Sequence, residues 1–181
     1  AKLPALDLFI PMLTGEPLCD KNFLPRLLYA REKMPTPTFN VYTNGSLLTH
    51  EAIDIIKQVG NILINVSLNG ITPETRKRLM GLDDYHQVVR SVKYMEMVKQ
   101  SYRVSLVAYP ELKAEELDTF VKSGGMALQY QSWAGEMYPH ERKRWTACVR
   151  AVNYMTVRYN GDVCLCCFDP LVKYKFGDLK T

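Results

Sequence analysis

The sequence predicts an α/β fold in which parallel strands form a sheet or barrel and helices pack against it. Runs rich in β-branched and apolar residues alternate with runs of helical periodicity up to about residue 131. Alternation on this scale is typical of βαβ units. Several predicted strands also end in polar or glycine-containing turns. The 181 residues suffice for one domain, or one domain with a small appendage, and for a sizeable core.

Composition and charge argue against several classes of protein. A content of 47% hydrophobic and 23% charged residues is ordinary for a globular domain, and a net charge of +4 is too dispersed for a nucleic-acid surface. The chain contains no apolar run long enough for a membrane span and no signal peptide. We therefore expect a cytoplasmic protein without nucleic-acid or membrane partners. No methionine precedes the first predicted strand, which indicates a fragment or a processed chain.

The first predicted strand covers residues 8–10, and the apolar run that contains it ends in Thr14-Gly15-Glu16-Pro17. Gly15 allows a turn or a close approach to a ligand, and Pro17 prevents the strand from continuing. Glu16 is therefore a carboxylate at the carboxyl end of a strand, where parallel sheets and barrels bind ligands. A solvated glutamate in an ordinary loop is the other interpretation of these residues alone.

The remaining elements follow in alternation. Predicted strands cover residues 38–43, 61–68, 102–108 and 126–130. Predicted helices cover residues 22–34, 50–60, a segment opening at Thr72-Pro73-Glu74, a longer segment from Asp83 or Asp84 to about Lys99, and residues 114–122. Asn22, Thr49 and Thr72 are the expected N-caps. Two strands end in Asn-Gly, at Asn44 and Asn69. Three polar strand ends at one edge favour a binding site over unrelated turns.

The pattern changes after Ser132, and we place a domain boundary near residue 135, which gives domains of residues 1–135 and 136–181. Two β-prone runs, 153–159 and 162–166, flank Asn160-Gly161, which is a strong hairpin signal.

Four of the five cysteines lie in this second region, namely Cys148, Cys164, Cys166 and Cys167. Alternation along the second hairpin strand predicts Cys164 and Cys166 on one face. Thiolates gathered in this way favour zinc or an iron–sulfur cluster, although free cysteines also serve as small core residues. The nearby thiolates do not complete a four-ligand site, so further ligands would come from elsewhere.

With these motifs placed, the chain resembles the radical S-adenosylmethionine (radical SAM) enzymes that carry a C-terminal SPASM or twitch-type domain. Residues 14–17 resemble the family's Gly-Gly-Glu-Pro, with Thr14 replacing the first glycine, and residues 67–70 resemble Ser-Leu-Asp-Gly, with Asn69 replacing the aspartate. Residues 43–45 resemble its strand-three ending. Cys148, twelve residues, Gly161, four residues and Cys166 fit the opening of the SPASM pattern, and residues 176–179 resemble the motif that follows it.

The resemblance implies a partial radical SAM (β/α) barrel followed by a small cysteine-bearing β-hairpin region. It implies that Glu16 and nearby backbone groups hold the methionine ammonium of S-adenosylmethionine. The implied cofactor-binding residues are Gly15, Glu16, Pro17, Thr43, Asn44, Ser67 and Asn69. The implied ligands of an auxiliary [4Fe–4S] cluster are Cys148, Cys164, Cys166 and Cys167.

The resemblance also implies the activity of a longer parent protein. Such an enzyme would cleave S-adenosylmethionine at a [4Fe–4S] cluster, take electrons from a reductant such as flavodoxin or ferredoxin, and abstract hydrogen from a peptide or biosynthetic intermediate. The family's Cys-x3-Cys-x2-Cys triad would fall before Ala1, so we expect no radical chemistry from this chain alone and assign no catalytic residue. An inactive S-adenosylmethionine- or peptide-binding module and a structural zinc–thiolate domain are the alternatives.

Overall fold

The computed structural model of the chain describes residues 5–128, 153–169 and 171–180. The chain divides into two compact units, Ala1–Gln129 and Tyr130–Thr181, which we describe separately as unit 1 and unit 2. The predicted boundary near residue 135 and the candidate ligand Cys148 lie outside the described residues.

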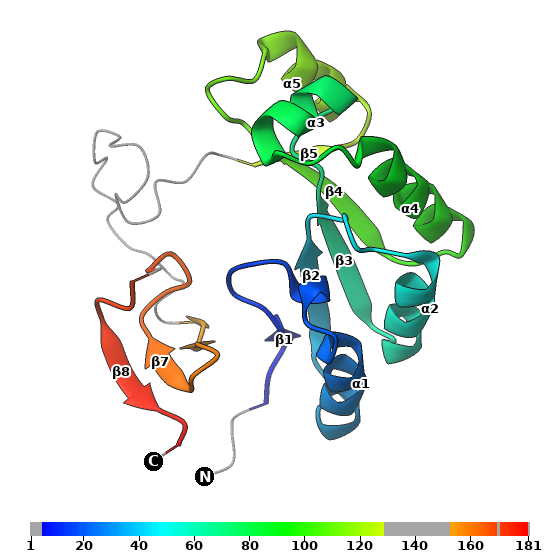
Figure 1. Ribbon diagram of the computed structural model, residues 1–181. Helices are drawn as coiled ribbons and strands as arrows, with labels where there is room; N and C mark the ends of the chain where they lie inside the picture. Colours follow the sequence, from blue (N-terminus) through cyan, green and yellow to red (C-terminus); the bar gives the residue numbers. More distant parts are fainter. Residues whose placement is uncertain (1–4, 129–152, 170, 181) are drawn as a thin grey trace. The chain divides into compact units, whose positions relative to one another are not determined.

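Unit 1 alternates strands and helices along the chain (Figure 1). Its strands are β1 (Leu8–Phe9), β2 (Thr38–Thr43), β3 (Ile62–Ser67), β4 (Tyr102–Val107) and β5 (Met126–Leu128). Its helices are the 3-10 helix η1 (Pro17–Cys19), α1 (Phe23–Lys33), α2 (His50–Val59), α3 (Pro73–Met80), α4 (Tyr85–Met97) and α5 (Ala114–Lys122). Among the described residues, no helix is both long and apolar enough to cross a membrane.

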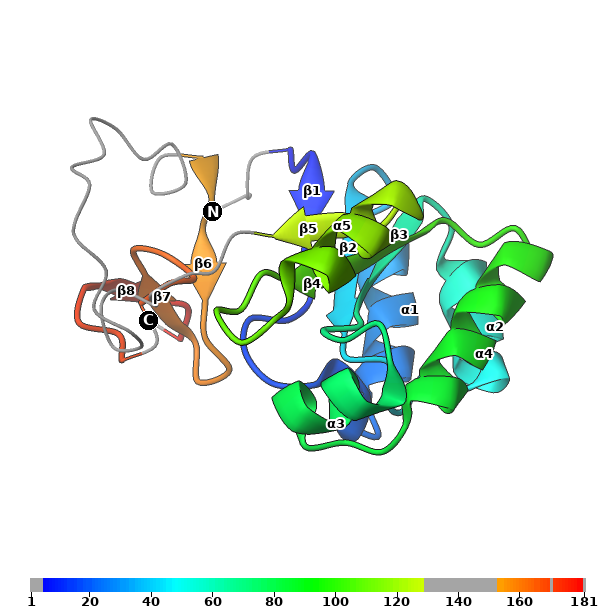
Figure 2. The same cartoon turned by 90° about the horizontal axis from the view of Figure 1, so that it is seen from above.

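The strands of unit 1 form one sheet in the order β1-β2-β3-β4-β5, and each neighbouring pair is parallel. All carboxyl ends therefore meet at one edge, which we call the carboxyl edge. Figures 1 and 2 show α1, α2 and α4 on the same face of the sheet. The predicted α/β fold, a partial (β/α) barrel, is confirmed.

The hydrophobic core of unit 1 lies between the sheet and helices α1, α2, α4 and α5. Strands contribute Phe39, Val41, Ile62, Ile64, Val66 and Leu106, and helices contribute Leu27, Ile53, Ile56, Val88, Met95 and Phe120. Side chains alternate between the two faces of a strand. In β3, Leu63, Asn65 and Ser67 therefore lie on the face opposite to the core.

The helix starts show which predicted caps form. Thr49 accepts a hydrogen bond from Ala52 N (3.1 Å) and Thr72 accepts one from Thr75 N (3.1 Å), so both predicted caps are confirmed. The predicted cap at Asn22 is wrong, because that side chain makes no capping bond. Asn22 already has helical backbone angles, which turn its side chain away from the free amides that a cap must reach.

Unit 2 contains an antiparallel sheet in the order β6-β7-β8, formed by β6 (Thr156–Val157), β7 (Asp162–Cys164) and β8 (Lys175–Asp178). The predicted hairpin at Asn160-Gly161 is confirmed, and Gly161 adopts a φ of 93°. The second hairpin strand ends at Cys164 rather than Cys166, because the pairing with β8 is irregular between Val163 and Cys164. Strand β8 was not predicted.

Candidate functional site

The Glu16 carboxylate lies at the carboxyl edge and is held by three hydrogen bonds. Its Oε1 accepts from Thr43 Oγ1 at 2.7 Å and from Leu18 N at 3.2 Å, and its Oε2 accepts from Asn44 N at 2.6 Å. The bond to Leu18 N makes Glu16 the cap of η1, with Pro17 buried at the first helical position. Glu16 is therefore an oriented carboxylate that joins the ends of β1 and β2, and the interpretation as a merely solvated loop residue does not hold.

The turn after β2 fixes the groups that contact Glu16. Thr43 Oγ1 accepts a hydrogen bond from Gly45 N (3.0 Å), and Asn44 Oδ1 accepts one from Ser46 N (2.9 Å). Gly45 has a φ of 83°, and an added Cβ would lie 2.8 Å from Val88 Cγ1, so only glycine fits both the backbone and the space. Thr43 and Asn44 are thus brought to Glu16 in one arrangement.

Asn69 and Ser67, at the end of β3, differ in how their side chains are used. Asn69 is buried with a φ of 49°, and its Oδ1 accepts from Val107 N at 3.0 Å while its Nδ2 contacts Met80 Sδ at 3.4 Å. Its carboxamide therefore links the ends of β3 and β4. Ser67 is half-buried at the same edge. A cofactor contact from Ser67 would leave these bonds in place, and Asn69 keeps one further N–H and one further lone pair beside them.

Arg76 of α3 connects the ends of β2 and β3, a role that the sequence analysis did not predict. Its side chain has 0% exposure, and it forms a bidentate ion pair with Asp84, with Nε–Oδ1 at 2.6 Å and Nη2–Oδ2 at 3.0 Å. It also donates to Asn44 O at 2.8 Å and to Leu68 O at 2.6 Å. One buried guanidinium therefore ties the end of β2 to the end of β3.

The ion pair changes the titration of Asp84 and the start of α4. Hydrogen bonds from Arg76, and then from Ser46 Oγ at 2.5 Å, hold the pKa of Asp84 below its usual range, against the opposing effect of burial. Because its carboxylate is used in this way, Asp84 forms no capping bond to α4. Gly70 completes the arrangement, since an added Cβ would lie 2.4 Å from Arg76 N.

The described cysteines of unit 2 occupy different environments. The buried Cys164 thiol donates to Thr156 O at 3.7 Å, and burial raises its pKa. Cys166 Sγ instead accepts a hydrogen bond from Phe168 N at 3.4 Å. Within the described residues, no three His, Cys, Asp or Glu side chains are close enough to form a metal site. Cys148 lies outside that part of the chain, so the predicted ligand set stays a prediction.

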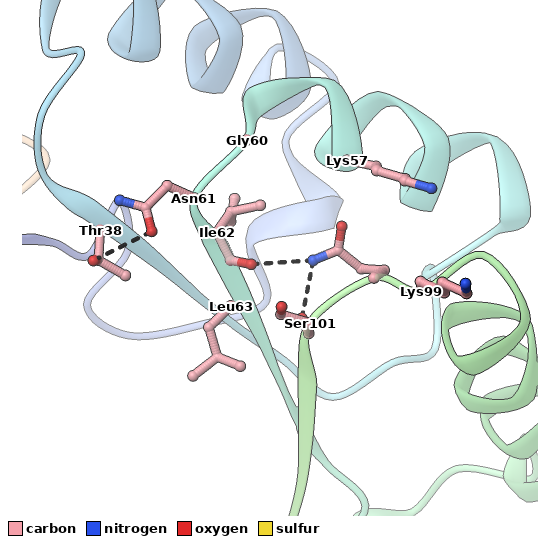
Figure 3. A pocket seen from close by; sticks show the side chains of 9 residues that line it. Thr38, Lys57, Gly60, Asn61, Ile62, Leu63, Lys99 and Ser101 are labelled. Atoms are coloured by element: carbon pink, nitrogen blue, oxygen red, sulfur yellow. Dashed lines mark hydrogen bonds between the residues drawn. The ribbon is translucent and has the colours of Figure 1, made fainter.

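A shallow pocket of about 350 Å³ lies at the opposite end of the sheet. Figure 3 shows it among the amino ends of the strands, lined by Thr38, Ile62 and Ser101 and by Lys57 and Lys99. Both of its amide-bearing residues already have partners: Gln100 donates to Ile62 O and Ser101 O, and Asn61 contacts Thr38 and Pro37. Parallel sheets bind ligands at their carboxyl ends, so the Glu16 cluster, and not this pocket, is the candidate site.

Comparison with known protein families identifies the family of this chain. Residues 9–123 match the model of the radical SAM superfamily, a segment that includes every side chain of the Glu16 and Arg76 clusters. The chain belongs to the radical SAM superfamily. Residues 148–181 match the SPASM iron–sulfur cluster-binding domain, which confirms the predicted SPASM-type region. The search of curated proteins found no match.

Solved structures of radical SAM enzymes share the fold at low sequence identity. The structure of anSMEcpe with bound AdoMet has a TM-score of 0.68 and 14% identity, over 94% of this chain and 60% of that chain. Native anSMEcpe with AdoMet and the Cp18Cys peptide has a TM-score of 0.69 and 15% identity, over 94% and 63%. Streptococcus suis SuiB bound to the precursor peptide SuiA has a TM-score of 0.57 and 19% identity, over 73% and 30%. The chain thus spans less than two thirds of each.

Proposed function

We propose that this chain binds S-adenosylmethionine at the carboxyl edge of its sheet, as part of a radical SAM oxidoreductase or maturase that acts on a peptide. The single observation that carries the proposal is the oriented Glu16 carboxylate, held by Thr43 and by the backbone of Asn44. Membership of the radical SAM superfamily and similarity to two structures with bound AdoMet support it.

The hydrogen bonds of Glu16 suit it to bind an ammonium group. A carboxylate has about four lone-pair positions, and the protein uses three of them. The remaining position is on Oε2, where it can accept a charged N–H, and such bonds are stronger than neutral ones. Gly15, with a φ of 88° and open space around it, gives the backbone the turn that brings Glu16 to this position.

The other proposed cofactor contacts surround Glu16. Pro17 fixes the start of η1, while Thr43, Asn44 and Ser67 present polar groups at the ends of β2 and β3. Asn69 is proposed with them, although its amide bonds to Val107 and Met80 give it a positioning role in this arrangement. When bound next to a reduced [4Fe–4S] cluster, S-adenosylmethionine supplies the radical chemistry of this family. The protein supplies the binding, orientation and exclusion of water.

The auxiliary cluster is proposed to use the cysteines of the second region. Cys166 is the best placed of the described ones, because its sulfur already accepts an N–H bond, and Cys148 and Cys167 are proposed with it. Cys164 would first have to lose its proton and its bond to Thr156 O. The match to an iron–sulfur cluster-binding domain supports a cluster, and we propose that it is a [4Fe–4S] cluster. The proposed reductant of the whole enzyme is a flavodoxin or ferredoxin. The same family and fold support residues 1–135 and 136–181 as the two domains.

A peptide substrate is proposed from the structures that share the fold. SuiB was solved with its precursor peptide SuiA, and anSMEcpe was solved with the Kp18Cys and Cp18Cys peptides.

The test uses the whole protein that contains this chain, reconstituted anaerobically with iron and sulfide and reduced with dithionite. We expect it to convert S-adenosylmethionine to 5′-deoxyadenosine and methionine, and the Glu16→Gln variant to do so at least tenfold more slowly at limiting cofactor, by about the strength of one charge-assisted bond. Glu51→Gln, on the exposed start of α2, is the matched control. A wild-type protein that contains the cluster but forms no 5′-deoxyadenosine would contradict the proposal.

A further inference from the structure

Asn65 lies in the middle of the sheet on the face opposite to the core. It alternates along β3 with Ile64 and Val66, which are both in the core. The strand register places Tyr42 of β2 on one side of Asn65 and Arg103 of β4 on the other. Figures 1 and 2 show α1, α2 and α4 on the other face of the sheet.

The carboxamide of Asn65 is buried without hydrogen bonds. The residue is 1% exposed, and neither Nδ2 nor Oδ1 has a partner in the part of the chain that the structure describes. Buried amides in folded proteins are almost always bonded, and an unbonded one calls for a physical reason. Asn69, four residues further along, has both of its amide atoms in contact with the protein, so the local fold can satisfy such a group. Asn65 therefore has unused capacity for one donor and one acceptor.

The neighbours of Asn65 carry further unused polar groups. The Tyr42 hydroxyl and the exposed Arg103 guanidinium form no hydrogen bond or ion pair with the described residues, and Asn40 Oδ1 is buried without a partner. Asn40 lies on the same face of β2, two residues before Tyr42. Asn65 lies two residues before Ser67, a distance of about 7 Å along the strand. The unbonded groups thus form one patch next to the proposed cofactor site.

We propose that Tyr42, Asn65 and Arg103 bind an acidic peptide, with a peptide group paired to the Asn65 carboxamide and a carboxylate bound by Arg103. A peptide group offers one N–H and one C=O, which satisfies both atoms of Asn65, whereas a carboxylate alone would leave Oδ1 unpaired. Arg103 then supplies the planar donors that match a carboxylate. Tyr42 and Arg103 form no hydrogen bond or ion pair with the described residues, so none of these would be lost if their side chains rotated to admit the ligand. This inference rests on the proposed peptide substrate and names its chemistry.

The probe is N-acetyl-glutamate amide, titrated into the 15N-labelled 181-residue chain and followed by NMR at the side-chain signals of Asn65 and Arg103. We expect saturable shifts at both. The neutral isostere N-acetyl-glutamine amide should bind about tenfold more weakly, as should the glutamate probe to Asn65→Leu and Arg103→Gln. Arg90→Gln, exposed on α4, should bind like wild type.

A second measurement separates a ligand site from a structural asparagine. Asn65→Leu removes two unpaired buried groups, so its melting temperature should rise while probe affinity falls. A lower melting temperature, or unchanged probe affinity in this variant, would overturn the inference. S-adenosylmethionine affinity should be the same in Asn65→Leu and wild type. If the wild type bound no S-adenosylmethionine, the proposed function would be contradicted. The peptide titration would still test the inference in that case.

Discussion

Replacing Arg76 with Met should strongly destabilise unit 1, because Arg76 joins two strand ends from a fully buried position. Met keeps an unbranched stem of similar length but removes the charge and every donor. The substitution leaves Asp84 without its cationic partner and leaves the carbonyls of Asn44 and Leu68 without the bonds that they accept.

The expected loss follows from these contacts. Removing one partner of a buried ion pair costs about 3–5 kcal/mol. The side chain of Asp84 is 14% exposed, so water recovers part of this and the lower end of the range applies. The two carbonyl bonds add about 1 kcal/mol each. We therefore expect a loss of about 5 kcal/mol in the free energy of unfolding, a large part of the typical total of about 5–15 kcal/mol.

Urea denaturation followed by circular dichroism measures this loss. Arg78→Met is the matched control, because Arg78 lies on the same helix, is exposed, and donates only one bond to Glu111 O at 3.2 Å. The control should stay within about 0.5 kcal/mol of wild type. If Arg76→Met also stayed within about 1 kcal/mol of wild type, Arg76 would not hold the strand ends together as described.

Three further predictions concern the same clusters. The pKa of Asp84 is lowered in the folded chain, so its ion pair stabilises the fold above the unfolded pKa of about 3.9 and is lost as pH falls through the folded value. The difference in unfolding free energy between wild type and Asp84→Asn should therefore be constant at pH 5–7, within about 0.5 kcal/mol, and shrink below about pH 4; a constant difference throughout would contradict the pairing. Gly70→Ala should lower the free energy of unfolding, measured by urea titration, by about 1–3 kcal/mol, because its Cβ would lie 2.4 Å from Arg76 N. Gly177→Ala is the control, because Gly177 has open space around it. An equal or smaller loss for Gly70→Ala than for Gly177→Ala would refute this steric reason. Cys166→Ala should lose most of the iron and acid-labile sulfide after anaerobic reconstitution while Cys164→Ala keeps them, and zinc without sulfide in the wild type would instead indicate a structural thiolate site.

Local sequence signals predicted the elements of unit 1 because each signal is complete within a few residues. The β-branched run of β2 ends where predicted, and the caps at Thr49 and Thr72 form because the amides that they bind lie three residues away. Strand β8 carries a lysine and an aspartate at its ends and a glycine between them, a weak strand pattern. Its pairing with β7 depends on a distant part of the chain, so it could not be predicted locally.

The residue types of the candidate site could be predicted from the sequence, but the hydrogen bonds and ion pairs that connect them could not. Glu16 could be placed at a strand end, yet its bonds to Thr43 and Asn44 join residues 27 and 28 positions apart. Arg76 stands beside Lys77 and Arg78 in a polar helix, a pattern that indicates an exposed surface. Only the packing of α3 against Gly70 and the strand ends buries it. The spacing of eight residues between Arg76 and Asp84 gives no helical pairing signal, because α3 ends between them.

The measurement that tests the central claim most directly is the affinity of the 181-residue chain and its Glu16→Gln variant for S-adenosylmethionine, by isothermal titration calorimetry. Gln preserves the volume and its Oε1 can still accept bonds from Thr43 and Leu18, but its Nε2 cannot accept from Asn44 N or from an ammonium. The difference therefore reports the combined loss of the charge and of the Oε2 acceptor. We expect the variant to bind about tenfold or more weakly, the contribution of one bond between charged groups, while Glu51→Gln binds like wild type. Equal affinity of wild type and Glu16→Gln, within about twofold, would contradict the claim that Glu16 binds the cofactor's amino group.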